Sequence, residues 1–500
     1  MIYKLMIIAA LLIFIAALIG IYVDYLKDQQ SGEDKKEIIK NDDKNTEKIL
    51  DVLNENDADT KKRLNALEKA VQNFGKESFN FKKETGFTLD QLKEFSKRII
   101  KESKSHLDKG NAFFILNQYE KAIEEYSEAI IENPYSSLAF FNRANATFHK
   151  LLSIKSSSDI NNTFYLFNED FDTKELNDET FKEIILDYKK AFEIDSSLSN
   201  VHNNIGVIYN LLGKSEMAIS SFEKAISMNN NDSEYYSNLG AVYSDFALSS
   251  GNSNYYKKAL KNFKTAIKIK DSFSLYPYNI GIVYTRTKEH TKSIKYFNKA
   301  IELNPTFYKP YVARGRSYFY LGNYKETIND FGSISDFDRI LDIDRYRGEL
   351  LLLRGSSFFE VKKYPEAIDD LTKCIEFGYG GVAPYEIRGN VFLHLTKYKE
   401  AIEDYTKVIS REKNNTYVYR TRGVCFAKLG EFEKSIEDFN EAIKINGTVS
   451  ESYSNRGLSY YHLKNYEKAV IDFRKALSLN PNDKLASHYM KILTNKPQGI

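Results

Sequence analysis

The sequence has two cysteines, no tryptophan, eight prolines and 24 glycines among 500 residues. Two cysteines exclude a disulfide scaffold, a structural zinc cluster and an iron–sulfur protein. Few prolines and glycines indicate long helices, because these residues interrupt chains that are rich in strands or loops. Lysine and arginine total 71 against 69 acidic residues. Proteins that bind nucleic acid usually have a basic domain or stripe, and this near balance of charge gives no sign of one. The composition therefore predicts a helical protein that has no nucleic acid as partner.

Charged residues are absent from Leu5 to Val23, near the amino terminus. A helix of that length rises about 28 Å, close to the hydrocarbon thickness of a bilayer. A cleaved signal peptide is the alternative, but its apolar core usually spans only about 7–15 residues before a small-residue cleavage site. We therefore expect a short tail over residues 1–4 and a single-pass anchor over residues 5–23 in a bacterial inner membrane. Lysines after the span favour a cytoplasmic soluble body.

The following segment, residues 24–101, is charged and contains no proline. Six apolar residues fall on a heptad seam, which Asp57 and Thr60 interrupt: Leu50, Leu53, Leu64, Leu67, Val71 and Phe74. The seam is too short and broken to specify a strong coiled coil. We interpret the segment as a solvated helical neck, with weak self-association through the seam as the alternative. Thr88 and Gln91 have the spacing of a capping box and predict the start of a second helix.

One spacing recurs through the rest of the chain. A small residue recurs ten times, nine times with an aromatic residue three positions later, and six of the nine intervals are 34 residues. We number the repeats one to ten by these small residues: Gly110, Ala144, Gly206, Gly240, Gly281, Gly315, Gly355, Gly389, Gly423 and Gly457. Twelve positions later comes Ala or Ser in most repeats, and a large ring or Leu follows four positions further on. Positions three and four apart share a helix face, so each repeat holds two helices that meet through small residues.

This pattern resembles the tetratricopeptide repeat family, in which stacked helix pairs bury a continuous core. The clearest units are Tyr311–Tyr318, Tyr419–Phe426 and Tyr453–Tyr460. The resemblance implies an all-α fold, an α-solenoid of about ten helix-turn-helix repeats over residues 102–481. Repeat two carries 28 extra residues, an insertion at about 153–180; repeat four carries seven extra residues at about 247–254, and six extra residues follow repeat six. Residues 482–496 resemble a capping helix that shields the last repeat.

Charge follows the repeat. In six repeats Arg stands directly before the small residue, and in those repeats alone Asp stands directly before the second-helix ring: Arg143 with Asp187, Arg314 with Asp330, Arg354 with Asp370, Arg388 with Asp404, Arg422 with Asp438 and Arg456 with Asp472. In repeats three to five the arginine position holds an apolar residue and the aspartate position holds an uncharged one. Repeat one has Lys109 and Glu125 at these two positions. This matching predicts a salt bridge between the two helices of each repeat. A phosphate-binding row of arginines is the alternative, but each arginine comes with its own acid.

The matching of arginine with aspartate also holds across the insertion in repeat two, where Arg143 and Asp187 lie far apart in sequence. We therefore expect the insertion to leave the stack intact. Ala144 should then pack near the helix that carries Ile184, Tyr188 and Ala191.

Motifs for chemistry are missing from the sequence. It has no phosphate loop, no Gly-x-Ser-x-Gly elbow and no His-Glu-x-x-His. His149, His394 and His462 occupy the same position in three different repeats, so they cannot meet at one metal. Cys374 and Cys425 stand at helix-packing positions, where buried, inert thiols are expected. We therefore predict no enzyme activity, no metal and no cofactor.

The resemblance implies a scaffold, tethered to the membrane, that binds a partner protein or peptide in a concave groove lined by the first helices. Asparagine suits the backbone amides of an extended peptide, and rings suit its apolar side chains. The positions that match the groove are Asn111, Phe114, Asn145, Phe148, Asn203, Asn210, Tyr320, Asn390 and Tyr461. The alternative is a structural or assembly protein that self-associates through the neck and the solenoid.

Overall fold

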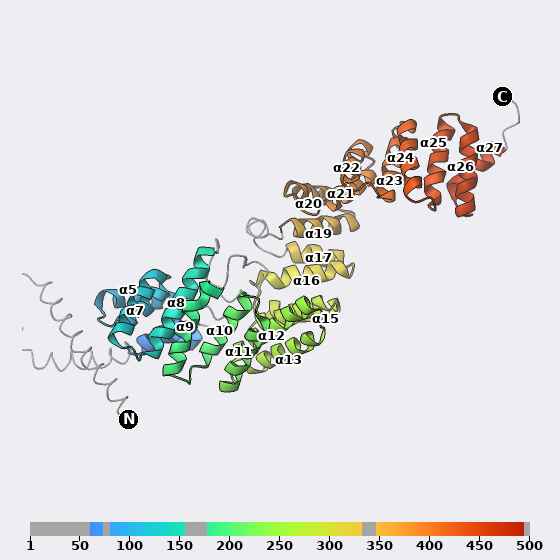
Figure 1. Cartoon of the computed structure of the whole chain (residues 1–500). Helices are drawn as coiled ribbons and strands as arrows, with labels where there is room; N and C mark the ends of the chain where they lie inside the picture. Colours follow the sequence, from blue (N-terminus) through green and yellow to red (C-terminus); the bar gives the residue numbers. More distant parts are fainter. Residues whose placement is uncertain (1–60, 74–80, 156–177, 333–346, 495–500) are drawn as a thin grey trace, which may run out of the picture. The chain divides into compact units, whose positions relative to one another are not determined.

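The computed structural model describes residues 61–73, 81–155, 178–332 and 347–494, and these residues form helices and turns without a strand (Figure 1). The chain divides into two compact units, Met1–Asn279 and Ile280–Ile500. We describe each unit by itself. Within both, consecutive helices pack against each other, as the 34-residue spacing predicts.

The first unit begins with a helix over residues 61–73 and continues through repeats one to four. Its further helices are α4 (Phe81–Thr85), α5 (Leu89–Glu102), α6 (His106–Ile115), α7 (Tyr119–Glu132), α8 (Ser137–Lys155), α9 (Asp178–Ile194), α10 (Ser199–Leu211), α11 (Ser215–Met228), α12 (Ser233–Ser250) and α13 (Asn254–Ile269). Helix α14 (Leu275–Arg286) contains the division between the units. The even-numbered helices from α6 to α14 are the first helices of repeats one to five.

The second unit continues with repeats five to ten. Its helices are α15 (His290–Leu303), α16 (Tyr308–Tyr320), α17 (Tyr324–Gly332), α19 (Arg347–Glu360), α20 (Tyr364–Glu376), α21 (Ala383–His394), α22 (Tyr398–Arg411), α23 (Thr416–Lys428), α24 (Phe432–Ile445), α25 (Ser450–His462), α26 (Tyr466–Leu479) and α27 (Lys484–Thr494). Helices α16, α19, α21, α23 and α25 are the first helices of repeats six to ten.

The small residue of the first helix allows the ring of the second helix to approach. A Cβ atom added to Gly389 would lie 2.9 Å from Cε1 of Tyr405, and one added to Gly457 would lie 2.8 Å from Cε1 of Phe473. Both rings are fully buried. Because a protein interior is close-packed, this contact sets the distance between the two helices of a repeat.

A left-handed residue makes the turn between the two helices. It stands seven positions after the small residue and has a positive φ in eight repeats: Asn117, Gly213, Lys288, Gly322, Lys362, Thr396, Gly430 and Lys464. Glycine adopts this conformation readily, whereas the other five residues carry a Cβ that disfavours it. Repeats two and four, which have extra residues between their helices, do not show it at this position.

Two helical caps close the stack. Residues 61–73 form a helix in which Leu67, Ala70 and Val71 are buried in one apolar cluster with Leu92 and Ile99 of α5 and with residues of α6. This part of the predicted neck therefore packs on repeat one instead of standing in solvent, while residues 24–60 lie outside the described part of the chain. The capping box predicted at the start of α5 is confirmed by reciprocal hydrogen bonds between Thr88 and Gln91.

At the other end, α27 lies against repeat ten. Ala486 is fully buried in a cluster with Ala469, Phe473 and Ala476 of α26, and the ring of Tyr489 stacks on Phe473. Asp483 begins the helix by accepting a hydrogen bond from the backbone of Ala486 at 3.0 Å. The predicted capping segment thus covers the apolar end of the last repeat.

The predicted membrane localisation needs correction. Crossing a bilayer takes about 20 consecutive apolar residues. In the described part of the chain no helix is both long and apolar enough to cross one, and this finding contradicts the membrane assignment. The longest described helix, α8, has 19 residues and carries Arg143 and Lys150. The predicted span itself, residues 5–23, lies outside the described residues.

The insertion in repeat two leaves the stack intact, as predicted. Helix α9 packs against α8, and Ile184, Tyr188 and Ala191 are buried. The hydroxyl of Tyr188 donates to Oδ1 of Asn145, next to Ala144, at 2.7 Å. The extra residues therefore leave the register of the repeat unchanged.

Candidate functional site

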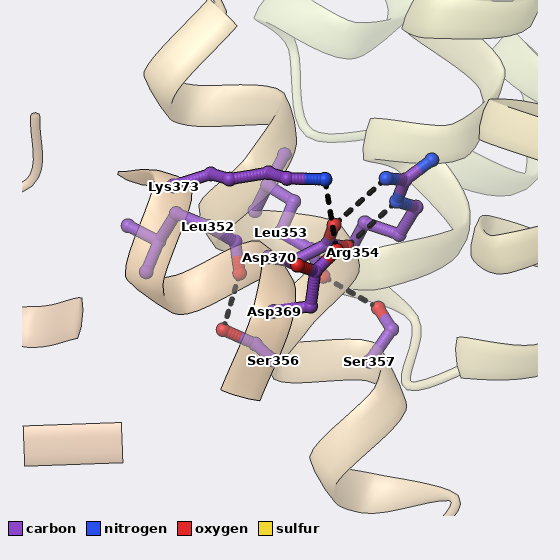
Figure 2. Close-up of polar contacts among 8 residues, drawn as sticks. All are labelled: Leu352, Leu353, Arg354, Ser356, Ser357, Asp369, Asp370 and Lys373. Carbon is purple, nitrogen blue, oxygen red and sulfur yellow. Dashed lines mark hydrogen bonds and ion pairs between the residues drawn. The ribbon is translucent and has the colours of Figure 1, made fainter. Parts of the chain in front are cut away.

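Each of the six arginines forms a two-pronged ion pair with the aspartate of its own repeat. In the pair of Arg422 and Asp438, Nε donates to Oδ2 at 2.8 Å and Nη2 donates to Oδ1 at 2.7 Å. Figure 2 shows the equivalent pair of Arg354 and Asp370, with both distances 2.7 Å. The remaining pairs, Arg143–Asp187, Arg314–Asp330, Arg388–Asp404 and Arg456–Asp472, have the same geometry. This planar fork matches a carboxylate, and lysine cannot reproduce it.

The third nitrogen of the arginine reaches the preceding repeat. Nη1 of Arg422 donates to Oγ1 of Thr406 on α22 at 2.9 Å. Four other arginines bond in the same way, to Ser127, Asn298, Thr372 and Asn440. All five acceptors stand 17 positions after the small residue of their repeat. Comparison of the repeats did not predict this bond. The sequence does contain a signal for it: where an apolar residue replaces the arginine, in repeats three to five, the preceding repeat has Lys189, Glu223 or Lys264 at the acceptor position.

Burial dominates the electrostatics of these pairs. The Asp370 side chain is 2% exposed, and its partner Arg354 is 18% exposed. Burial raises the pKa of Asp370 above its ordinary value, and the Arg354 guanidinium offsets only part of this effect. The same holds for the pKa values of Asp330, Asp404 and Asp438. These arginines are thus committed to internal partners, and the arrangement does not favour an anion-binding row.

Three asparagines of the predicted groove accept hydrogen bonds inside their own repeats. Oδ1 of Asn111, Asn145 and Asn390 accepts a hydrogen bond from the buried hydroxyl of Tyr126, Tyr188 and Tyr405, respectively, at 2.7–2.9 Å. Asparagine follows the small residue only in repeats one, two and eight, and only those repeats have Tyr as the second-helix ring. The comparison of repeats that revealed the ion pairs would therefore have revealed these bonds too.

The remaining groove candidates divide by exposure. Phe114, Phe148 and Asn203 are buried in the first unit, so they do not line an accessible surface there. Asn203 accepts a hydrogen bond from the Asn238 side chain at 3.0 Å, which joins repeats three and four. Four candidates stay at least partly exposed, namely Asn210, Tyr320, Asn390 and Tyr461. Tyr320 is 65% exposed, and its ring stacks on His290.

The three histidines that share a repeat position also share a contact. His149, His394 and His462 each stack on the ring that begins the second helix of the preceding repeat: Tyr119, Tyr364 and Phe432. The centroid distances are 5.6, 6.0 and 4.8 Å. Within the described ranges, no group of three or more His, Cys, Asp and Glu residues is placed to hold a metal ion.

The first helices of the second unit present a partly open apolar row. In repeats six, seven, eight and ten the position four residues after the small residue holds Phe319, Phe359, Leu393 and Tyr461, all half-buried, whereas repeats five and nine have Thr285 and Ala427 there. In the first unit the equivalent Phe114, Phe148 and Ser244 are buried, and Asn210 is half-buried. Sequence register alone does not distinguish these cases: a histidine of the next repeat contacts the ring in both, His149 on Phe114 with centroids 5.1 Å apart and His394 on Phe359 at 5.5 Å.

Polar groups flank this row. Arg316 on α16 pairs with Glu349 on α19 at 2.8 Å. Tyr417, which is 41% exposed at the start of α23, donates a hydrogen bond to Oδ1 of Asn390 at 3.0 Å. The face thus combines accessible rings with a charge-balanced border.

Comparisons with known proteins bear on these repeats. Three family models described as tetratricopeptide repeat match the chain, at residues 278–307 and 450–483, at 103–134 and 199–232, and at 388–449. No curated protein matches it.

Among solved structures, MamA is similar at 22% identity over 34% of this chain and 95% of MamA, with a TM-score of 0.31. YrrB, described as a TPR protein with an unusual peptide-binding site, is similar at 20% identity over 46% of this chain and 97% of YrrB, with a TM-score of 0.27. The first TPR of Spaghetti (RPAP3), bound to an HSP90 peptide, is similar at 27% identity over 23% of this chain and 90% of its own, with a TM-score of 0.22. The segments that match the family models contain the expected helix pairs, and these matches support the assignment of tetratricopeptide repeats in this chain.

Proposed function

We propose that the chain is a non-catalytic scaffold that binds an extended segment of a partner protein on the first helices of its second unit. The observation that carries the proposal is the set of half-buried Phe319, Phe359, Leu393 and Tyr461, which occupy one position in repeats six, seven, eight and ten, with the small Ala427 at that position in repeat nine. A row of this kind matches an extended chain, whose side chains also recur at a regular distance. Accessible aromatic residues are the usual anchors of protein interfaces.

The border of the row supports a partner without strong net charge. Arg316 is paired with Glu349, and Arg420 lies 3.5 Å from Glu451. Tyr320 and Tyr417 add exposed rings with hydroxyl groups beside the row. Such groups fix the orientation of a bound backbone through hydrogen bonds while the apolar row supplies affinity.

The test is selection of random peptides on the full chain, followed by fluorescence anisotropy with the enriched sequences. Tyr320→Ser removes a 65% exposed ring beside the row and should weaken binding about tenfold, a loss of about 1.4 kcal/mol. Ile471→Ser is the matched control, because Ile471 is 59% exposed on the second helix α26. Equal losses in both variants, or a selection that enriches no apolar sequence, would contradict the proposal.

The alternative, self-association through the neck, has less support. Its seam includes Leu67 and Val71, which are 0% and 1% exposed because they pack on repeat one. These two side chains are therefore not available to a second copy while the cap is in place.

A further inference from the structure

The outer face of α13 carries positive charge alone. Residues 254–269 contain five lysines and no acidic residue. Lys257, Lys261, Lys264 and Lys268 are exposed, and their spacing of four, three and four residues places them on one side of the helix. Within the described ranges none of these four makes an ion pair. The fifth, Lys258, lies 5.2 Å from the ring centroids of Tyr243 and Tyr255.

A lysine stripe has a cost for the folded chain. Like charges three and four residues apart destabilise a helix by a few tenths of a kcal/mol per pair. Most other second helices carry both signs of charge; α22, for example, contains Lys399, Lys407 and Arg411 as well as Glu400, Glu403 and Asp404. The one-sign stripe on α13 is therefore a specific surface that gains from an acidic partner.

The complementary surface occurs on α7 of the same unit. Glu120, Glu124, Glu128 and Glu132 are exposed at intervals of four residues, and Lys121 is the sole cation of the helix. Oε1 of Glu120 lies 3.6 Å from Nζ of Lys150, and Oε1 of Glu132 lies 3.6 Å from Nε2 of His106. Glu124 and Glu128 make no ion pair with any residue that the structure describes.

Two exposed apolar side chains lie near the end of α7. Ile131 is 71% exposed, and Tyr135, just after the helix, is 80% exposed. Within the helix, Glu124, Glu128 and Ile131 repeat the spacing of Lys257, Lys261 and Lys264, four and three residues. Large apolar groups at such exposure beside unpaired charges indicate a protein–protein interface.

We propose that α13 of one copy of the chain docks on α7 of a second copy. Both helices are second helices of their repeats (Figure 1). Glu124 and Lys261 occupy the same place in repeats one and four once the seven extra residues of repeat four are set aside. The charges are complementary, and Glu124, Glu128 and Ile131 have the helical spacing of Lys257, Lys261 and Lys264. A two-fold arrangement forms the contact twice, once from each chain.

A nucleic acid fits these observations less well. The lysines occupy one helix of a chain whose net charge is +2, and α7 presents acids in the same unit. A phosphate backbone would also leave Ile131 and Tyr135 without a partner. A second copy uses both stripes at once.

The test is a charge exchange, followed by sedimentation velocity on the full chain. Glu124→Lys with Glu128→Lys makes both stripes positive, and Lys261→Glu with Lys264→Glu removes the positive centre of α13. The wild type should dimerise at about 0.1 M salt and dissociate near 1 M, where charges are screened within about 3 Å. Each double variant should be monomeric at the lower salt concentration. An equimolar mixture of the two should dimerise again, because α7 of the first then faces α13 of the second.

The matched control is Glu433→Lys with Glu437→Lys on α24, which changes charge by the same amount at the equivalent repeat positions of Glu120 and Glu124. It should leave the dimer unchanged, and circular dichroism should show every variant folded. A wild type that stays monomeric in low salt overturns the proposal, and so does a mixture that fails to associate. A monomeric wild type that shifts random-sequence duplex DNA, with the shift lost in the Lys261/Lys264 variant, would assign the stripe to nucleic acid instead.

Discussion

Replacing Arg422 by isoleucine should destabilise repeat nine by about 3 kcal/mol, because it leaves the Asp438 carboxylate buried without its partner. The Asp438 side chain is 6% exposed, so water cannot replace the two bonds at 2.7 and 2.8 Å. Loss of the third bond, to Thr406, should add little, because that hydroxyl is at the surface. The expected loss therefore comes mainly from the orphaned carboxylate.

Adding Asp438→Ser to Arg422→Ile should recover much of the loss. The double variant reproduces the pair found in repeat three, Ile205 with Ser221. There the Ser221 hydroxyl donates to the backbone oxygen of Met217 at 2.8 Å and needs no partner from the first helix. Replacing a buried ion pair as a whole is often nearly neutral, so we expect the double variant within about 1 kcal/mol of the wild type.

Hydrogen exchange of the α23 and α24 amides is the suitable assay, since repeat arrays need not unfold in one step. Opening free energies in these two helices should fall in Arg422→Ile and rise again in the double variant. A double variant no more stable than Arg422→Ile would refute the pairing account of the repeats. Amides of α10 and α11, which belong to the other unit, serve as the internal control.

Three further predictions concern buried groups. Burial lowers the pKa of His149 from 6.5 to about 4, so between these two pH values the unfolded chain binds more protons than the folded one. Acidification to about pH 5 should therefore lower the free energy of unfolding by about 2 kcal/mol in urea titrations, and His149→Phe should lose this pH dependence. Asn390→Val should cost about 1–3 kcal/mol in thermal melts by leaving the Tyr405 hydroxyl unpaired, and adding Tyr405→Phe should regain most of it. Burial raises the pKa of Cys374 to about 11 and that of Cys425 to about 12, so iodoacetamide at about pH 8 should label neither thiol until the chain is denatured; rapid labelling of the folded chain would contradict their burial.

The repeat spacing and the ion pairs could be predicted from the sequence because ten copies of one unit allow comparison within a single chain. Arg422 and Asp438 vary together between repeats, and such covariation reports contact. The same signal exists for Asn390 and Tyr405, but the prior expectation of a groove assigned Asn390 to a ligand instead. A comparison restricted to one repeat at a time also missed the bond from Arg422 to Thr406, because its two ends belong to different repeats.

Exposure was the property that the sequence predicted least well. Phe114 and Phe319 occupy the same register position, but Phe114 is fully buried and Phe319 is half-buried. The difference lies in what the next repeat places above the ring, and no local pattern contains that information. Leu67 and Val71 illustrate the same limit, since a heptad seam does not say whether its partner is another chain or the first repeat.

The placement of each aspartate inside the repeat of its own arginine has a consequence for how such a gene can grow. A duplicated or deleted stretch of 34 residues carries both members of the pair with it, so no charge is stranded at the new junction. The bond to the preceding repeat is less demanding, because serine, threonine and asparagine all accept it: Ser127, Thr372 and Asn298 do so here. A shuffled repeat therefore needs only a small polar neighbour to fit, and the array can change length in whole repeats without a matching second mutation.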